Sequence, residues 1–395
     1  MKKGVISILL IFCLSFVYLM SNNFCFAEAK QLDDSNFSAK SYILIDYNSG
    51  EILSQKNQDE KMPVASIVKL MTINLVCDEI EANRLSLDEM VTVSQNAQSM
   101  GGSQVFIEAN AQYSVGDLLK STIISSANDA SVALAERISG SEESFVIEMN
   151  RKAKELGLNN TNYVNCTGLP ASNQFSCARD TAILLKDVLK HDAYHKYSTI
   201  WMDTLSHPKG RESELVNTNK LVRYYEGCDG GKTGSTSEAG FCLVATAKRK
   251  DMRLIGAVLG AKSGKARFAE TSQLLNFGFN NFQNKKVVDS KVTLDKKVRV
   301  NNSQIDQIML RPQKDLFVLS KKGEDDDYST KIEINESVNA PIKKGDVVGK
   351  IYVIKNGEIK TECDIISEQN ADKATYFDYL TKTVKNWKIA KEGDC

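Results

Sequence analysis

Hydrophobic runs separated by turn residues divide the chain beyond residue 40 into two strands and a helix. The segment 41–46, Ser-Tyr-Ile-Leu-Ile-Asp, predicts a buried strand, and the turn residues 48–50 lead into a second strand at 51–53. Apolar residues then recur at helical spacing from Ser66 to Ile80, and a proline at position 63 suits the approach to a helix N-terminus. The pattern therefore predicts a hairpin followed by a helix.

The middle of the chain combines helical periodicity with a pair of strands. Residues 85–165 are predicted to be largely helical, and Gly264–Phe282 predicts a closing helix. A glycine-rich approach at 227–234 precedes small and β-branched residues at 241–247 and 254–259, which predict an antiparallel pair. Helices together with an antiparallel sheet indicate an α+β domain, expected over residues 28–283.

At about residue 284 the pattern changes to short alternating segments separated by polar or glycine turns. This pattern predicts a small all-β domain, a β-sandwich over residues 284–372. Its predicted strands lie at 298–300, 316–319, 331–334 and 347–353.

The tail, residues 373–395, predicts an amphipathic helix. Phe377, Leu380, Val384 and Trp387 share one helical face, while lysines point away from it. Such a helix can lie on a membrane surface as an anchor. Docking of the same helix on the β domain is the alternative.

The first 27 residues have the layout of a secretory signal peptide. Lys2 and Lys3 precede an apolar run at 5–20, and small residues at Cys25 and Ala27 mark a cleavage site after residue 27. An uncleaved membrane anchor is the alternative, because the apolar run is nearly long enough to span a bilayer. We therefore expect a secreted protein that works at the outer face of the cytoplasmic membrane or in the cell wall.

Composition excludes several classes of function. Removal of the signal peptide takes away two lysines, which leaves 48 basic side chains against 50 acidic ones, so nothing favours nucleic-acid binding. The mature chain keeps seven widely spaced cysteines without a Cys-x-x-Cys pair, which argues against a zinc site or a disulfide framework. A Cys166–Cys177 bridge stays open, but buried free thiols are favoured.

Ser66 and Lys69 form the first candidate catalytic pair. Three residues apart on a helix, their side chains lie on the same face, one turn apart. An amine that burial keeps neutral can take the proton of the serine hydroxyl. The backbone N–H of Ser66, near the helix start, is also free to stabilise an oxyanion. The spacing alone is weak, because Ser206 and Lys209 share it across a proline that argues against a helical pairing.

Two further short motifs carry chemistry. Ser126-Ala127-Asn128 lies between two predicted helices, where a loop can place a hydroxyl and an amide toward a cleft. Lys232-Thr233-Gly234 occurs once, beside a predicted strand; its cation and hydroxyl can hold a substrate carboxylate, and the glycine lets a ligand backbone approach closely. Taken singly, each motif is better explained as solvated loop residues.

Together, in order and spacing, the three motifs resemble the S-x-x-K, S-x-N and K-T-G motifs of the penicillin-binding protein and serine β-lactamase superfamily. Their context over residues 38–282 resembles the low-molecular-mass penicillin-binding proteins that are D-alanyl-D-alanine carboxypeptidases, the peptidase S11 family. The matching segments are Pro63–Thr72, Gly101–Ser103, Ser125–Ala130, Thr167–Pro170, Ala178–Asp180, Asp229–Gly234 and, in the β domain, Ala340–Gly345.

This resemblance implies a transpeptidase-like α+β fold and a serine-type carboxypeptidase that removes the terminal D-alanine from peptidoglycan stem peptides. It also implies covalent inhibition by β-lactam antibiotics, without a metal or cofactor. The implied catalytic residues are Ser66 as nucleophile, Lys69 as general base and Ser126 as proton relay. The implied substrate-binding residues are Asn128 for the substrate amide, Lys232, Thr233 and Gly234 at the carboxylate, and Ser235, whose N–H completes the oxyanion hole with that of Ser66.

Other residues have smaller implied parts. Arg267 is a candidate for assisting at the carboxylate, although a surface arginine is favoured, and Asp180 either shapes the loop facing the cleft or forms a structural salt bridge. The three histidines, His191, His195 and His207, lie far from every motif in the sequence and are expected on the surface. A Ser-His-Asp triad is therefore disfavoured.

Three rival functions differ in what they need. A β-lactamase needs a group that activates water, such as a loop glutamate, and residues 169–179 contain no acid. A D,D-endopeptidase acting on cross-links uses the same residues in a roomier cleft and stays open. A non-catalytic wall-binding protein would have a degenerate site, whereas all three motifs are complete.

Overall fold

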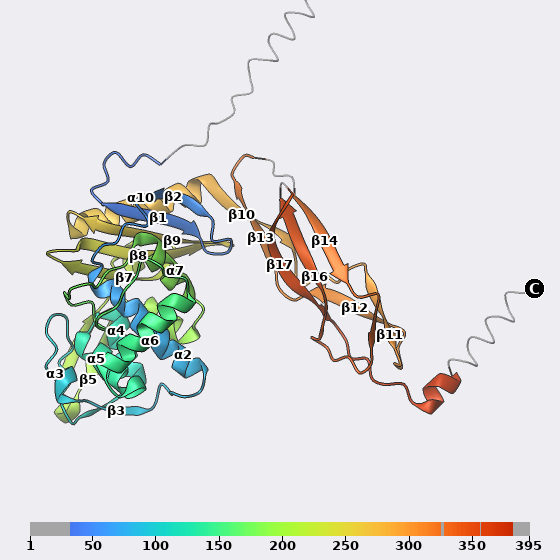
Figure 1. The fold of residues 1–395 in the computed structure, drawn as a ribbon, viewed down its shortest axis with the longest axis horizontal. Helices are drawn as coiled ribbons and strands as arrows, with labels where there is room; N and C mark the ends of the chain where they lie inside the picture. Colours follow the sequence, from blue (N-terminus) through green and yellow to red (C-terminus); the bar gives the residue numbers. More distant parts are fainter. Residues whose placement is uncertain (1–31, 325–327, 356, 382–395) are drawn as a thin grey trace, which may run out of the picture. The chain divides into compact units, whose positions relative to one another are not determined.

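The computed structural model describes residues 32–324, 328–355 and 357–381 (Figure 1). The predicted signal peptide lies outside the described residues, as does the predicted tail helix beyond residue 381. The described residues contain helices, antiparallel sheets and a C-terminal β region, so the predicted α+β class is confirmed.

A five-stranded antiparallel sheet organises the larger part of the chain. Its order is β2 (Ile52–Lys56), β1 (Ser41–Asp46), β9 (Met252–Ala261), β8 (Gly240–Arg249) and β7 (Cys228–Thr236). The predicted hairpin and the predicted antiparallel pair are therefore neighbours in one sheet. The glycine-rich segment that was expected to precede a strand is itself β7, and β7 is an edge strand.

Helices cover both faces of this sheet. Figure 1 shows α10 (Gly264–Asn281) over one face and α7 (Ala178–Val188), with the helical region, on the other. The other helical segments are η1 (Ala65–Val68), α2 (Lys69–Glu81), α3 (Gln95–Gln98), α4 (Val115–Ile124), α5 (Asn128–Ser139), α6 (Glu142–Glu155), α8 (Asp192–Ser198), η2 (Pro208–Gly210) and α9 (Leu221–Tyr224). Serine N-caps explain several of the starts: the hydroxyl oxygens of Ser114, Ser141 and Ser263 each accept a backbone N–H three residues on.

The prediction that residues 85–165 are largely helical is only partly right. The amphipathic stretches at 130–138 and 142–156 became α5 and α6, but a hairpin of β3 (Met90–Thr92) and β4 (Gln112–Ser114) precedes them. A second hairpin, β5 (Met202–Ser206) with β6 (Glu212–Val216), follows α8.

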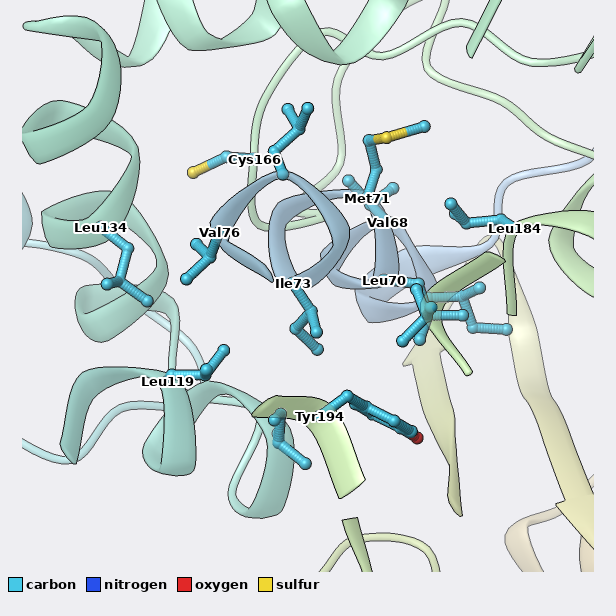
Figure 2. Close-up of a cluster of buried hydrophobic side chains, with 14 of the residues drawn as sticks. Val68, Leu70, Met71, Ile73, Val76, Leu119, Leu134, Cys166, Leu184 and Tyr194 are labelled. Carbon is cyan, nitrogen blue, oxygen red and sulfur yellow. The ribbon is translucent and has the colours of Figure 1, made fainter. Parts of the chain in front are cut away.

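The helix that carries Lys69 runs through the middle of the core. Every residue of α2 from Lys69 to Cys77 is buried, as expected for a helix that is apolar on nearly all sides. Figure 2 shows Leu70, Ile73 and Val76 among side chains from the surrounding helices. Those partners include Leu119, Leu134, Leu184 and Tyr194. The segment that carries Ser66 and Lys69 is therefore packed from several directions.

The C-terminal part is all β, as predicted. Its strands are β10 (Phe282–Val288), β11 (Lys297–Asn301), β12 (Gln307–Pro312), β13 (Leu316–Lys321), β14 (Tyr328–Ile334), β15 (Ser337–Asn339), β16 (Val347–Lys355) and β17 (Glu358–Ser367). They form a six-stranded sheet in the order β14-β16-β17-β12-β11-β15 and a pair, β10-β13. Alternate inward residues such as Val298, Val300, Ile308 and Leu310 build a separate apolar core.

Six of the predicted mature cysteines lie in the described residues, and all six are buried free thiols, including Cys166 and Cys177. The favoured prediction is confirmed for these six. The part of the tail that the structure describes is helical at 376–381. Within the described ranges, no helix combines the length and the apolar character needed to cross a bilayer.

Candidate active site

Ser66 and Lys69 lie where the short helix η1 passes into α2. The Lys69 Nζ donates to Ser66 Oγ at 3.1 Å and to the Thr167 carbonyl at 2.5 Å. Ser66 is half-buried, whereas the Lys69 side chain has no exposed surface. Burial lowers the pKa of Lys69 from 10.5 to about 7, although the nearby Cys166 and Asp129 favour the charged amine. A neutral amine within hydrogen-bond distance of a hydroxyl is the arrangement that a general base requires.

The loop 165–169 supplies the second partner of Lys69. Asn165 Oδ1 accepts the backbone N–H groups of Thr167 and Gly168, and Asn165 Nδ2 donates to the Leu169 carbonyl. These bonds fix the loop so that the Thr167 carbonyl faces Lys69. Gly168 has a φ of +81°, and a Cβ there would lie 2.1 Å from the Ala65 carbonyl oxygen. Only glycine allows this loop to pass so close to Ala65 and Ser66.

Ser126 and Lys232 form a second pair. Lys232 Nζ donates to Ser126 Oγ at 2.7 Å, although the two residues are 106 positions apart in the chain. Both side chains are buried. Burial, with help from the charges of Lys69 and Arg267, holds the pKa of Lys232 well below its usual value. Because the charge of Lys69 lowers the pKa of Lys232, the amines of the first and third motifs are close enough to influence each other.

Backbone strain accompanies this geometry. Ser126 has a φ of +61° and Ala65, directly before Ser66, has a φ of +50°. Each left-handed non-glycine residue costs on the order of 1–3 kcal/mol, and such residues cluster at functional sites. The strained positions are therefore Ser126 itself and the residue directly before Ser66.

The side-chain amide of Asn128 uses its nitrogen in a hydrogen bond but not its oxygen. Its Nδ2 donates to the Gly101 carbonyl at 2.6 Å, while its buried Oδ1 has no hydrogen-bond partner among the described residues. A buried acceptor without a partner is costly unless a ligand satisfies it. Asn128 can therefore accept an N–H from a bound substrate.

Asp129, next in the chain, was not predicted as a functional residue. Its buried carboxylate accepts the backbone N–H groups of Val105 and Ile107, which ties the loop after Gly101 to the start of α5. It also raises the pKa of Lys69 electrostatically. Its position next to Asn128 is the one sequence feature that could have singled it out.

Strand β7 brings the third motif against the segment that carries Ser66. A Cβ on Gly234 would lie 2.3 Å from the Val64 carbonyl oxygen and 3.2 Å from the Ile67 nitrogen, so the strand backbone touches η1 directly. Thr233 is buried and Ser235 is exposed on the same strand. Because β7 is an edge strand, it presents backbone groups that no neighbouring strand uses.

Arg267 is not the surface residue that was favoured. It is half-buried, and its NH1 donates to the carbonyls of Gly234 and Cys242, which lie on β7 and β8. The surface prediction failed because α10 lies over the sheet, so a long side chain from its first turn reaches the strand edge.

Asp180 is hydrogen-bonded to the loop at 160–161, and among the described residues its carboxylate forms no salt bridge. Its buried carboxylate accepts the Asn160 backbone N–H and the Thr161 hydroxyl.

The expectation of surface histidines is wrong for His191 and His207, which are 4% and 6% exposed. His191 bonds to Glu81 and Asn74, and His207 bonds to Tyr113 and Ser213. Local sequence carries no sign of these long-range partners.

The described residues contain no group of three or more histidine, cysteine or acidic side chains arranged to hold a metal ion.

Comparison with known proteins identifies two matching families. Residues 27–263 match the D-alanyl-D-alanine carboxypeptidase model of peptidase S11, and residues 282–373 match the C-terminal domain model of penicillin-binding protein 5. The chain is 38% identical to the D-alanyl-D-alanine carboxypeptidase DacF of Bacillus subtilis, over 91% of this chain and 92% of that protein.

Solved structures agree. The chain superposes on penicillin-binding protein 5 from Haemophilus influenzae with a TM-score of 0.67 and 32% identity, over 85% of this chain and 98% of that one. It also resembles penicillin-binding protein D2 from Listeria monocytogenes in its ampicillin-bound form, with a TM-score of 0.55 and 33% identity, over 62% of this chain and 98% of that one. The chain therefore belongs to the peptidase S11 family of low-molecular-mass penicillin-binding proteins and is a serine-type D-alanyl-D-alanine carboxypeptidase.

Proposed function

We propose that Ser66 is the acylated nucleophile of this carboxypeptidase and Lys69 its general base. The supporting observation is the buried Lys69 amine 3.1 Å from Ser66 Oγ, with a pKa of about 7. Ser66 Oγ bonds to the carbonyl carbon between the last two D-alanines while its proton passes to Lys69 Nζ. The scissile C–N bond then breaks as Ser126 gives its hydroxyl proton to the leaving nitrogen and takes the proton held by Lys69 in exchange, so that D-alanine departs and Lys69 is neutral again.

Lys232 and Thr233 bind the terminal carboxylate of the stem peptide. The hydrogen bond to Ser126 positions the Lys232 amine. A bound carboxylate raises the pKa of Lys232, because an opposite charge favours the ammonium form. Gly234 keeps the strand close to η1, which brings the Ser66 and Ser235 N–H groups toward one oxyanion. The open Oδ1 of Asn128 accepts a substrate amide.

Water completes the cycle by attacking the acyl carbon, while Lys69 takes its proton and Ser66 regains one. The loop 169–179 has no acid to activate this water strongly, so a β-lactam that acylates Ser66 is released slowly. This fits covalent inhibition by β-lactams rather than rapid hydrolysis, and the related Listeria monocytogenes protein was solved in an ampicillin-bound form.

A D-alanine release assay tests these assignments. Purified protein is expected to liberate D-alanine from a peptide ending in D-Ala-D-Ala, and penicillin G is expected to block the release by forming one adduct that peptide mapping places on Ser66. A Ser66→Ala variant with full activity, or an adduct on another residue, would falsify the assignment. Cleavage of cross-linked dimers at a rate equal to that of the monomeric peptide would instead favour the endopeptidase function.

We further propose that residues 1–27 direct secretion and that the protein acts outside the cytoplasmic membrane, where stem peptides are found. The division into a catalytic domain at 28–283 and a β-sandwich at 284–372 is supported by two family models that match on either side of residue 282. N-terminal sequencing of secreted protein tests the cleavage after Ala27.

The tail is proposed to lie on the membrane surface. The described start of the tail exposes Tyr376, Phe377 and Leu380 to solvent by 78%, 75% and 51%, which is the apolar face that an interfacial helix buries. Deletion of residues 376–395 should abolish flotation with liposomes that contain anionic phospholipid, and a Phe377→Ser variant should weaken it. Unchanged flotation of both variants would refute the anchor.

A further inference from the structure

The Thr167 carbonyl affects how the Lys69 amine is oriented. A neutral amine has two N–H groups and one lone pair, whereas a carbonyl oxygen can only accept a hydrogen bond. The carbonyl, 2.5 Å from Lys69 Nζ, therefore takes an N–H, while Ser66 Oγ lies 3.1 Å from the same nitrogen. This arrangement leaves the lone pair for the Ser66 hydroxyl, as transfer of the serine proton requires. The position of the carbonyl thus affects how well Lys69 can act as the proposed base.

Thr72 holds the peptide group directly before that carbonyl. It lies on α2 three residues after Lys69, so the two side chains share one face of the helix, one turn apart. Thr72 Oγ1 donates to the Cys166 carbonyl at 2.7 Å, and the next carbonyl in the chain, that of Thr167, bonds to Lys69. Thr72 and Lys69 are both completely buried. Two successive carbonyls of the loop are therefore matched to two successive turns of the helix that carries the proposed base.

Glu142 holds the same segment from another element. It is the first residue of α6, and its Oε1 accepts the Cys166 backbone N–H at 2.9 Å. Because Cys166 is completely buried, its N–H and its carbonyl both need partners within the protein. Burial and the carboxylate of Glu142 also hold the pKa of the Cys166 thiol well above its usual value, so the thiol stays neutral. Cys166, which Figure 2 shows beside α2, is thus bonded to both α2 and α6.

These two contacts differ in kind from those of Asn165. The Asn165 side chain bonds to backbone groups of its own loop, so it determines the shape of the turn. Thr72 and Glu142 lie outside the loop and bond to one residue within it. They determine where the turn, once shaped, lies relative to Lys69.

We infer that Thr72 is a positioning residue for the acylation step: its hydroxyl holds the Cys166 carbonyl so that the Thr167 carbonyl meets Lys69. Glu142 supports the same placement through the Cys166 N–H. The inference rests on the proposed function.

The expected effect of losing the Thr72 hydroxyl follows from these bonds. The buried Cys166 carbonyl loses its donor, which is costly unless the loop shifts to find another. A shifted loop withdraws the Thr167 carbonyl from Lys69, so the amine is less well oriented. A hydrogen bond from the ammonium to a carbonyl favours the charged form, so its loss also lowers the pKa of Lys69.

The test measures the rate of acylation by a fluorescent penicillin from pH 5 to pH 9 in Thr72→Val, which keeps the branched shape but lacks the hydroxyl. The plateau rate is expected to fall about ten- to a hundredfold, as for a displaced catalytic group, and the midpoint to move to lower pH than in the wild type. Thr72→Ser restores a hydroxyl and should recover the wild-type profile. Thr181→Val is the matched control. Thr181 is a buried threonine of α7 whose hydroxyl donates to the Ala178 carbonyl of its own helix, so this variant should keep the wild-type rate and midpoint.

Glu142 gives a second test outside the core, because its side chain is only half-buried. Glu142→Gln keeps an oxygen for the Cys166 N–H, whereas Glu142→Ala does not. Both variants remove the charge, so the ratio of their acylation rates isolates the hydrogen bond. The alanine variant is expected to be slower by about fivefold, comparable with the loss of one hydrogen bond. The titratable groups that act on Lys69, namely Cys166, Asp129 and Lys232, are the same in every variant.

A purely structural role of Thr72 would lower the resistance to urea and leave the pH midpoint in place. An unchanged midpoint in Thr72→Val, or equal rates in the two Glu142 variants, would overturn the inference while leaving the proposed function intact. If circular dichroism shows that Thr72→Val does not fold, the comparison of the two Glu142 variants decides. A wild-type protein that penicillin does not acylate at Ser66 would instead refute the proposed function.

Discussion

Acylation of Ser66 should depend on pH through the protonation of Lys69. Burial lowers the pKa of this amine from 10.5 to about 7. At pH 7 about half of the Lys69 side chains are then neutral, against about 3 in 10,000 for a lysine with an ordinary pKa. At neutral pH the lowered pKa thus gives about a thousandfold more neutral amine, the form that the proposed base requires.

The measurement is the second-order rate constant for acylation by a fluorescent penicillin between pH 5 and pH 9. Below pH 7 the rate should fall about tenfold per pH unit, because only neutral Lys69 can take the Ser66 proton, and above pH 7 it should level off. Far-UV circular dichroism at each pH shows whether the fold is retained. A flat profile, or a rate that keeps rising up to pH 9, would refute the role of Lys69.

Asp129 provides an independent check on the same base. Its carboxylate raises the pKa of Lys69, so Asp129→Asn should move the midpoint of the acylation profile to lower pH. The asparagine side chain keeps an acceptor oxygen for the Val105 or Ile107 N–H. A midpoint that stays in place or rises would mean that the two groups do not interact.

Three further outcomes follow from the packing around the site. Gly234→Ala should lower the acylation rate at least a hundredfold, because the new methyl group would lie 2.3 Å from the Val64 carbonyl oxygen. Gly101→Ala is the control: its methyl group would have no atom within 4 Å, so the acylation rate should hardly change. Equal rates for the two variants would contradict this reasoning. Lys69→Met should be inactive but more stable to urea than the wild type. Between pH 7 and pH 10.5 the unfolded chain binds a proton at Lys69 that the folded chain largely lacks, so wild-type stability rises with pH. The stability advantage of Lys69→Met should therefore shrink by roughly 2 kcal/mol from pH 7 to pH 9. An advantage that is independent of pH would contradict the depressed pKa. Asn165→Ala should slow acylation about tenfold, because the Thr167 carbonyl is no longer fixed against Lys69, and an unchanged rate would contradict this role of the loop.

Local pattern determined most of the elements. The strand 41–46, the helices α5, α6 and α10 and the antiparallel pair β8–β9 all follow from apolar periodicity, because burial of one face imposes a period of 2 or 3.6 on the chain. The pattern failed at 90–114, where a short hairpin and a loop replace helix. In that loop the backbone N–H groups of Val105 and Ile107 bond to Asp129. Asp129 belongs to a separate segment, and hydrophobic periodicity carries no information about such contacts.

The sequence alone also determined which residue types are present in the three motifs and in what order, and Ser66 with Lys69 follows directly from helical spacing. Only the tertiary structure decided that Lys232 meets Ser126 across 106 positions, that the Thr167 carbonyl bonds Lys69, and that Arg267, His191 and His207 are not simple surface residues. The physical reason is that a base, a relay and a carboxylate anchor gain their chemistry from burial and from contacts at a few ångströms. Those depend on how η1, β7 and the loop at 165–169 pack together, and no local stretch of sequence encodes that packing.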